Sequence, residues 1–177
     1  MKPVKIKYPY IYIVRYIPQK YSIVSDEDRK SRELVYAFKD GHCPVEYMER
    51  IVTIIKKVTA NHPETWVVAF VPASEYKRHI ERFISLRDYI EDNISITVHL
   101  EALMYDLQRK PVHKSSYRYT VNSVVNETAF KDKNVILIDD VITTGKSFQQ
   151  AGNILRRIGA KRIYGIIFAK TFYPEEK

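Results

Sequence analysis

Two adjacent carboxylates and the polar residues that follow them form the stretch of this sequence best suited to chemistry. Asp139 and Asp140 end an apolar run, and the stretch reads VILIDDVITTGKS over residues 135–147. Ionised carboxylates accept hydrogen bonds and donate none, which suits a pair of sugar hydroxyls or a divalent cation. A turn with hydroxyls and Gly145 before a helix start suits a phosphate, because the unpaired N–H groups there favour an anion. These residue types in this order predict a site for a ribose 5-phosphate.

Three other interpretations of the same stretch follow from its residues. Residues 145–147 resemble the end of a phosphate-binding P-loop, but that pattern needs a glycine five residues before Gly145, where Asp140 stands. An apolar strand with two acids also resembles the magnesium-binding acid of a nucleotide hydrolase, which needs a separate phosphate loop. In the third interpretation the two acids are plain turn and cap residues of an α/β fold.

The pattern of strands and helices along the chain indicates the frame that must position these residues. Apolar and β-branched runs predict strands, and a 3.6-residue apolar spacing predicts helices. The predicted strands are residues 10–16, 66–71, 94–100, 135–138 and 162–169, and the predicted helices are residues 26–38, 45–58, 75–92 and 147–158. This alternation predicts an α/β domain with a mainly parallel sheet, in which ligands bind beyond the carboxyl ends of the strands. The polar and basic residues 108–122 predict a long surface loop.

The composition limits the class of protein. The chain has 177 residues, of which 45% are hydrophobic, so one globular domain is expected. Cys43 is the one cysteine, which excludes a disulfide framework and a cysteine-rich zinc site within one chain. The longest apolar run, residues 66–71, is too short to span a membrane and the first residues lack a secretory pattern, so a cytoplasmic location is expected. The net charge of +8 indicates an anionic partner, either nucleic acid or a phosphate or pyrophosphate.

Residues 135–147 resemble the phosphoribosyl-pyrophosphate (PRPP) signature of type I phosphoribosyltransferases, with four apolar residues, two acids, a short apolar and hydroxyl stretch, and a Thr-Gly-x-Ser end. The fuller form is most similar to the ComF-type branch, which is linked to competence for DNA uptake. Further similar segments are LVYAFKDG at residues 34–41, VPAS at residues 71–74 and NETAF at residues 126–130. Unlike ComF-type proteins, this chain lacks an N-terminal four-cysteine zinc module.

The resemblance implies a fold. That fold is α/β and type I phosphoribosyltransferase-like, with a mainly parallel central sheet flanked by helices and a small N-terminal hood region. It implies a single domain over residues 1–177, with residues 1–40 as the hood or N-terminal extension and residues 41–170 as the core.

The resemblance also implies a role for each part of the site. Asp139 and Asp140 would be the catalytic acids that hold the ribose hydroxyls and, through the ligand, a Mg²⁺ ion. The PRPP 5-phosphate would be bound by Val141, Ile142, Thr143, Thr144, Gly145, Lys146 and Ser147. The pyrophosphate would be bound by Pro72, Ala73, Ser74, Arg78 and Arg82. A mobile loop would carry Lys110, Lys114 and Arg118.

The function implied is transfer of the 5-phosphoribosyl group from Mg-PRPP to a nitrogenous base, with release of pyrophosphate. Magnesium would be the cofactor, and PRPP and a base the small-molecule substrates. The alternative is a non-catalytic PRPP- or nucleotide-binding module associated with DNA uptake or another nucleic-acid process. A nucleic-acid partner is therefore open but not required, a homodimer is open, and no membrane partner is expected.

Overall fold

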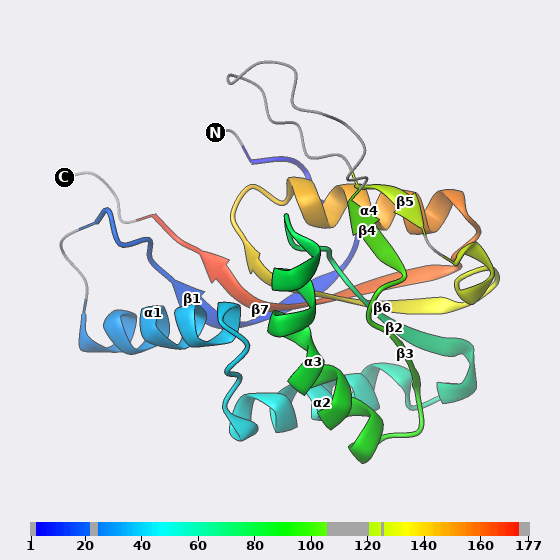
Figure 1. Ribbon diagram of the computed structural model, residues 1–177, viewed down its shortest axis with the longest axis horizontal. Coiled ribbons are helices and arrows are strands. Elements are labelled where there is room, and N and C mark those ends of the chain that lie inside the picture. The colour runs from blue at the N-terminus through cyan, green and yellow to red at the C-terminus, as the bar shows by residue number, and fades with distance from the viewer. Residues whose placement is uncertain (1–2, 22–24, 106–120, 125, 174–177) are drawn as a thin grey trace.

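A five-stranded parallel sheet in the order β1-β7-β6-β2-β3 forms the centre of the molecule (Figure 1). The computed structural model describes residues 3–21, 25–105, 121–124 and 126–173. The strands of the sheet are β1 (Tyr10–Tyr16), β2 (Trp66–Phe70), β3 (Thr97–His99), β6 (Asn134–Ile142) and β7 (Arg162–Thr171). A second, antiparallel pair joins β4 (Leu103–Tyr105) to β5 (Val121–Val124). The predicted α/β fold with a mainly parallel sheet is confirmed.

Helices cover both faces of this sheet. They are α1 (Asp26–Lys39), α2 (Val45–Thr59), α3 (Tyr76–Asn93) and α4 (Lys146–Arg157), with short 3-10 turns η1 (Pro63–Thr65) and η2 (Glu127–Ala129). In Figure 1, α4 lies above the strands and α2 lies below them, while α3 runs downward in front of the sheet. Within the part of the chain that the structure describes, no helix combines the length and the apolar run needed to cross a membrane.

The middle of β6 is apolar because its side chains fill two cores. Along β6, Ile136 and Ile138 pack into the cluster shared with α1, α2 and α3. Val135 and Leu137 point the other way, into the cluster shared with α4. The alternation continues through Asp139 and Asp140 and then breaks, since Val141 packs against the first cluster and Ile142 belongs to the second.

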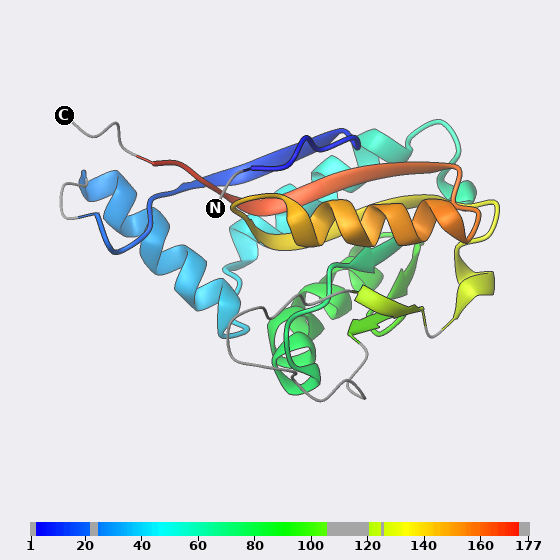
Figure 2. The same ribbon diagram turned by 90° about the horizontal axis from the view of Figure 1, so that it is seen from above.

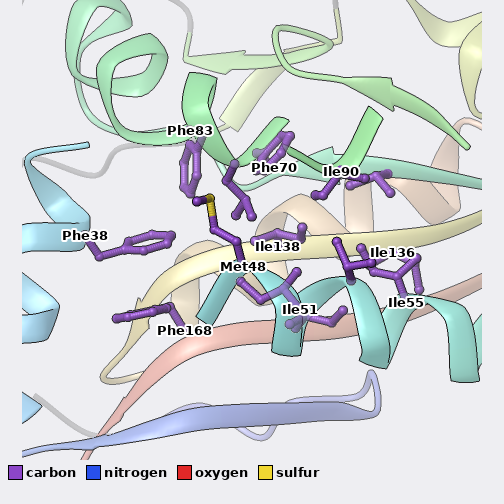
Figure 3. Packing of buried hydrophobic residues seen from close by; sticks show 14 of the residues in the cluster. Phe38, Met48, Ile51, Ile55, Phe70, Phe83, Ile90, Ile136, Ile138 and Phe168 are labelled. Atoms are coloured by element: carbon purple, nitrogen blue, oxygen red, sulfur yellow. The ribbon is translucent and has the colours of Figure 1, made fainter. Parts of the chain in front are cut away.

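Three aromatic rings fix α1 and α3 against the sheet near its carboxyl edge. Phe38, at the end of α1, stacks on Phe168 of β7 with ring centroids 4.1 Å apart. The ring of Phe83 on α3 meets the ring of Phe38 edge-on at 6.0 Å. Figure 3 shows these rings beside Met48 and Phe70 in one continuous core. Such aromatic pairs contribute beyond their buried area, so the two helices are held at the end of the sheet where the acids lie.

The structure corrects the predicted boundaries of β6. The predicted strand ended at Ile138, but β6 continues through Asp139 and Asp140 to Ile142. The reason is its neighbour, because β7 runs alongside and pairs Asp139 with Ile167. The two acids therefore belong to a strand with hydrogen-bonded neighbours and not to a free turn. The expected strand over residues 94–100 is also shorter, covering Thr97–His99 only.

The first residues of the chain lie on the sheet and on α4. Strand β1 is an edge strand that pairs in parallel with β7 along its length. Before it, the hydroxyl of Tyr8 donates to Asn153 Oδ1 on α4 at 2.9 Å. A Cβ on Gly152 would lie 2.3 Å from the Tyr8 ring, so only a glycine lets the segment approach this closely. The role of residues 1–40 as a hood stays a prediction; α1 extends away from the sheet at one end (Figure 2).

Candidate functional site

A pocket of about 200 Å³ lies at the carboxyl end of β6 and the start of α4. Its lining is Asp139, Val141, Ile142, Thr143, Thr144, Gly145, Lys146, Ser147 and Phe148. All seven residues predicted to bind a 5-phosphate are among them, together with the first of the two acids. The structure therefore brings this part of the predicted site together in one concave surface.

The turn that forms the pocket depends on Gly145. This residue is the N-cap of α4 and has a φ of +79°, in the left-handed region that side chains with a Cβ rarely adopt. The first N–H groups of α4 have no partner within the helix, so they face the space where an anion would lie. Thr143 is fixed from β7, since its hydroxyl lies 2.9 Å from the hydroxyl of Thr171. The local geometry is suited to an anion.

The N-terminal segment braces this turn, which sequence reasoning missed. The backbone N–H of Val4 donates to the carbonyl of Thr144 at 2.9 Å. Ile6 packs so tightly that a Cβ on Gly145 would lie 2.7 Å from Ile6 Cδ1. No spacing in the sequence links residues that are about 140 positions apart, so no local signal was available.

Asp139 is a buried carboxyl on the pocket side of β6. Its exposure is 6%, and its Oδ1 accepts the N–H of Asp140 at 2.9 Å. Burial raises the pKa of Asp139 well above the ordinary range, and the neighbouring Asp140 carboxylate raises it further. A carboxyl that keeps its proton can donate one hydrogen bond as well as accept others. A protonated Asp139 could therefore donate a hydrogen bond to a sugar hydroxyl and accept one from it, whereas an ionised carboxylate can only accept.

Asp140 points to the opposite face of the sheet and meets Arg82. Arg82 Nη1 lies 2.6 Å from Asp140 Oδ2, and both side chains are 14% exposed. The other oxygen of Asp140 accepts the N–H of Val141 at 2.6 Å. Arg82 also donates from Nε to the carbonyl of Lys39 at 3.4 Å. The ion pair joins α3 to β6, and it ties both to the end of α1.

The two arginines predicted together on α3 have different surroundings. Arg78 is 63% exposed, and its Nε lies 3.3 Å from a carboxylate oxygen of Glu75. Arg82 is directed at Asp140 instead, at the acidic end of β6. The structure therefore brings Arg82 into the site and leaves Arg78 on the surface beside its own counter-ion.

The turn after β2 starts beside the acids. The N–H of Val71 donates to the carbonyl of Ile138 at 2.8 Å, so the chain leaves β2 next to Asp139. Pro72 has no N–H, and the N–H of Ala73 donates to Nδ1 of His79 at 3.4 Å. The backbone donors that this turn can offer to a ligand therefore begin at Ser74. His79 is a site neighbour that sequence reasoning missed, because no motif marks it.

Three of the predicted site residues cannot be placed, and the described residues offer few metal ligands. Lys110, Lys114 and Arg118 lie outside the described residues. Within those residues, no group of three or more His, Cys, Asp or Glu side chains is placed to hold a metal ion. Asp139 offers one carboxyl at the pocket, while Asp140 is paired with Arg82 on the other face of β6. Mg²⁺ commonly binds through one or two carboxylates and the phosphates of a substrate. The donor set fits a magnesium ion that arrives with a diphosphate.

A parallel strand with two carboxyls near its end, beside a glycine turn at a helix N-terminus, is an arrangement suited to a sugar phosphate or nucleotide. The chain belongs to the phosphoribosyl transferase domain family, whose model matches residues 69–173, more than half of its length. The family match includes both the turn after β2 and the whole pocket at β6 and α4.

Individual relatives match over shorter stretches. An amidophosphoribosyltransferase of Pasteurella multocida is 46% identical over 50 residues, which are 28% of this chain and 10% of that protein. A ribose-phosphate pyrophosphokinase of Thermococcus kodakarensis is 50% identical over 34 residues, which are 19% of this chain and 12% of that protein. The chain thus matches only about a tenth of the length of these curated relatives.

Two solved structures give partial matches at low identity. The phosphoribosylpyrophosphate synthetase of Mycobacterium smegmatis superposes with a TM-score of 0.48 at 20% identity, over 70% of this chain and 33% of that one. The purine phosphoribosyltransferase of Pyrococcus horikoshii superposes with a TM-score of 0.40 at 18% identity, over 76% of this chain and 92% of that one.

Proposed function

We propose that the protein binds PRPP together with Mg²⁺ and transfers the 5-phosphoribosyl group to a nitrogenous base, releasing pyrophosphate. The observation that carries the proposal is the single pocket formed by Asp139 and residues 141–148 at the N-terminus of α4. Family membership over residues 69–173 supports the same chemistry.

In this proposal the pocket and the turn after β2 bind different parts of PRPP. The 5-phosphate binds at the N–H groups around Gly145, where the helix dipole favours a negative charge. The ribose hydroxyls bind at the end of β6, where the carboxyl of Asp139 can donate and accept hydrogen bonds, while Asp140 holds Arg82 on the other face of the strand. The pyrophosphate binds beside Ser74, because β2 and β6 are paired and Val71 donates to Ile138. The three parts of PRPP thus meet groups of the right polarity in the right order.

The transfer itself is a substitution at C1 of the ribose. The bond from C1 to the pyrophosphate oxygen breaks with its electron pair, while a base nitrogen forms the new bond to C1 and loses a proton. Positive charge develops on the sugar and negative charge on the leaving group, so fixed charges near each are effective. When bound with the diphosphate, magnesium supplies charge neutralisation of the leaving group. Arg82, fixed between α3 and β6, adds a second positive charge close to the same place.

The proposal is tested by pyrophosphate release in the presence of PRPP, Mg²⁺ and a panel of purine and pyrimidine bases. Asp140→Asn is expected to abolish release, since it removes the charge that holds Arg82. Asp132→Asn is the matched control, because Asp132 is an exposed residue with a φ of +62°, a conformation that asparagine adopts readily. Asp132 lies before the start of β6, and the strand from Asn134 to Asp140 alone spans about 20 Å.

Binding without turnover would favour the non-catalytic alternative. Titration calorimetry with PRPP and Mg²⁺ separates the two, since a transferase both binds and releases pyrophosphate. Absence of binding by PRPP, ribose 5-phosphate and pyrophosphate alike would refute the site.

A further inference from the structure

His79 is a buried histidine with both ring nitrogens engaged. Its exposure is 0%, and its ring lies against the rings of Phe70 and Phe83 at centroid distances of 6.5 Å and 5.2 Å. Nε2 lies 2.6 Å from the carbonyl oxygen of Leu100, which can only accept a hydrogen bond. Nε2 therefore carries the proton. Nδ1 is then free of a proton and accepts the N–H of Ala73 at 3.4 Å.

These two hydrogen bonds join two segments that are far apart in sequence. Ala73 belongs to the turn after β2, and Leu100 follows β3. A buried backbone N–H needs a partner, and in this turn the partner of the Ala73 N–H is the imidazole. The conformation of the turn, and with it the direction of the donors at Ser74, thus depends on which tautomer the ring adopts.

We propose that His79 is a positioning residue for the pyrophosphate turn, which it holds in the binding-competent conformation only while its ring is neutral. The inference rests on the proposed function, because it assigns the turn after β2 to pyrophosphate. A proton on Nδ1 would face the Ala73 N–H and replace an attractive contact by a repulsive one. The turn then loses its anchor, and the affinity for pyrophosphate falls while the affinity for ribose 5-phosphate is unchanged.

The surroundings of the ring favour the neutral form. Burial lowers the pKa of His79 below 6.5, and the charge of Arg82 on the same helix lowers it further. The hydrogen bond to Leu100 and the charge of Glu101, which follows Leu100, act in the opposite direction. Phe70 of β2 and Phe83 of α3 complete the ring's contacts and carry no charge. Since the pKa is lowered, the anchored turn is present at neutral pH and is lost only as the pH falls through that lowered pKa.

Two amide variants separate the two hydrogen bonds. Asparagine places an acceptor near the position of Nδ1, so His79→Asn retains a partner for the Ala73 N–H. Glutamine reaches the position of Nε2, so His79→Gln retains a donor to Leu100 but leaves the Ala73 N–H without its partner. Loss of one such hydrogen bond changes an equilibrium about five- to tenfold. We expect His79→Gln to bind magnesium pyrophosphate five- to tenfold more weakly, and His79→Asn to bind within about twofold of the wild-type protein.

The experiment is titration calorimetry of the wild-type protein and both variants with magnesium pyrophosphate and, separately, with ribose 5-phosphate, between pH 5 and pH 8. At each pH the wild-type protein and His79→Asn meet pyrophosphate in the same protonation state. The ratio of their affinities for pyrophosphate therefore depends on the proteins and not on the ionisation of the ligand. That ratio is expected to fall below pH 6.5, and ribose 5-phosphate affinity is expected to be equal in all three proteins.

The possible outcomes are distinct. An equal loss for both ligands, a flat ratio across the pH range, or tighter pyrophosphate binding by His79→Gln would overturn the positioning role. If the wild-type protein binds neither ligand, the proposed function itself fails and this inference with it. If His79→Gln does not fold, the pH dependence of the wild-type to His79→Asn ratio decides the question.

Discussion

Arg82 on α3 and Asp140 on β6 form an ion pair in which Nη1 lies 2.6 Å from Oδ2. The pair joins α3, which follows the turn after β2, to the acid near the end of β6. With both side chains 14% exposed, neither charge is screened by water as a surface pair would be. The two halves of the proposed substrate site are therefore coupled through one pair of opposite charges.

Breaking the ion pair between Arg82 and Asp140 should lower the free energy of unfolding. We expect Arg82→Met to lower the free energy of unfolding by about 1–3 kcal/mol, because Asp140 is left with an uncompensated, mostly buried charge. The double variant with Asp140→Leu should recover part of the loss, and urea unfolding of the four proteins gives the coupling energy. Arg78→Met is the control, since that exposed pair with Glu75 contributes less than about 0.5 kcal/mol. A coupling energy near zero would contradict the interpretation.

Replacing the ionisable carboxyl of Asp139 by an amide should stabilise the protein at neutral and alkaline pH. A raised pKa means that the folded state binds the proton more tightly than the unfolded state, so wild-type stability falls as the pH rises through that pKa. Asp139→Asn keeps the acceptor for the Asp140 N–H and cannot ionise. We expect its Tm to exceed that of the wild-type protein at pH 8 and the difference to vanish near pH 4. Thermal unfolding across this range measures it, with exposed Glu49→Gln as the control; a pH-independent difference would contradict it.

A methyl group at Gly145 should disturb the phosphate pocket specifically. Gly145→Ala places a Cβ at a φ of +79° and 2.7 Å from Ile6 Cδ1, so both backbone strain and a clash arise. Gly159→Ala shares the positive φ, at +101°, but the nearest atom to its Cβ is Lys131 Cγ at 3.4 Å. We expect both to lose about 1–2 kcal/mol of stability from the backbone alone, and only Gly145→Ala to lose ribose 5-phosphate affinity. Equal ligand affinity in the two variants would count against the pocket.

Shortening the Ile6 side chain should restore part of the ribose 5-phosphate affinity that Gly145→Ala loses. Ile6→Ala removes the Cδ1 and Cγ1 atoms that an alanine at 145 would meet at 2.7 Å and 2.9 Å. The double variant Ile6→Ala/Gly145→Ala is therefore expected to bind ribose 5-phosphate more tightly than Gly145→Ala alone, although the backbone strain remains. Calorimetry on the three proteins measures this, and no recovery would show that the backbone conformation alone decides the affinity.

The sequence predicted those parts of the molecule that depend on local pattern. Residues 141–147 lie in one pocket because the chain itself turns there from a strand into a helix, and periodicity is enough to find both elements. The length of β6 could not be predicted, because its last residues are held by pairing with β7. The parallel partner of a strand is not encoded in its own residues.

The contacts missed by sequence reasoning are all tertiary. Arg82 and Arg78 are equivalent in helical spacing, and only the position of Asp140 across the core distinguishes them. His79 looked like any other histidine because its partners, Ala73 and Leu100, are brought to it by β2 and β3. Burial and partner geometry separate these residues, and both exist only once the chain has folded.

The parallel pairing of β1 with β7 has a kinetic consequence. Tyr10 lies opposite Gly165, about 155 residues further along the chain. Contacts between such distant positions form slowly, because the entropy of closing the intervening loop must be lost before they stabilise anything. During synthesis β1 leaves the ribosome well before its partner strand exists. The hydrogen bond from Val4 to Thr144 comes from the segment just before β1, so we expect the turn at Gly145 to reach its final form late in folding.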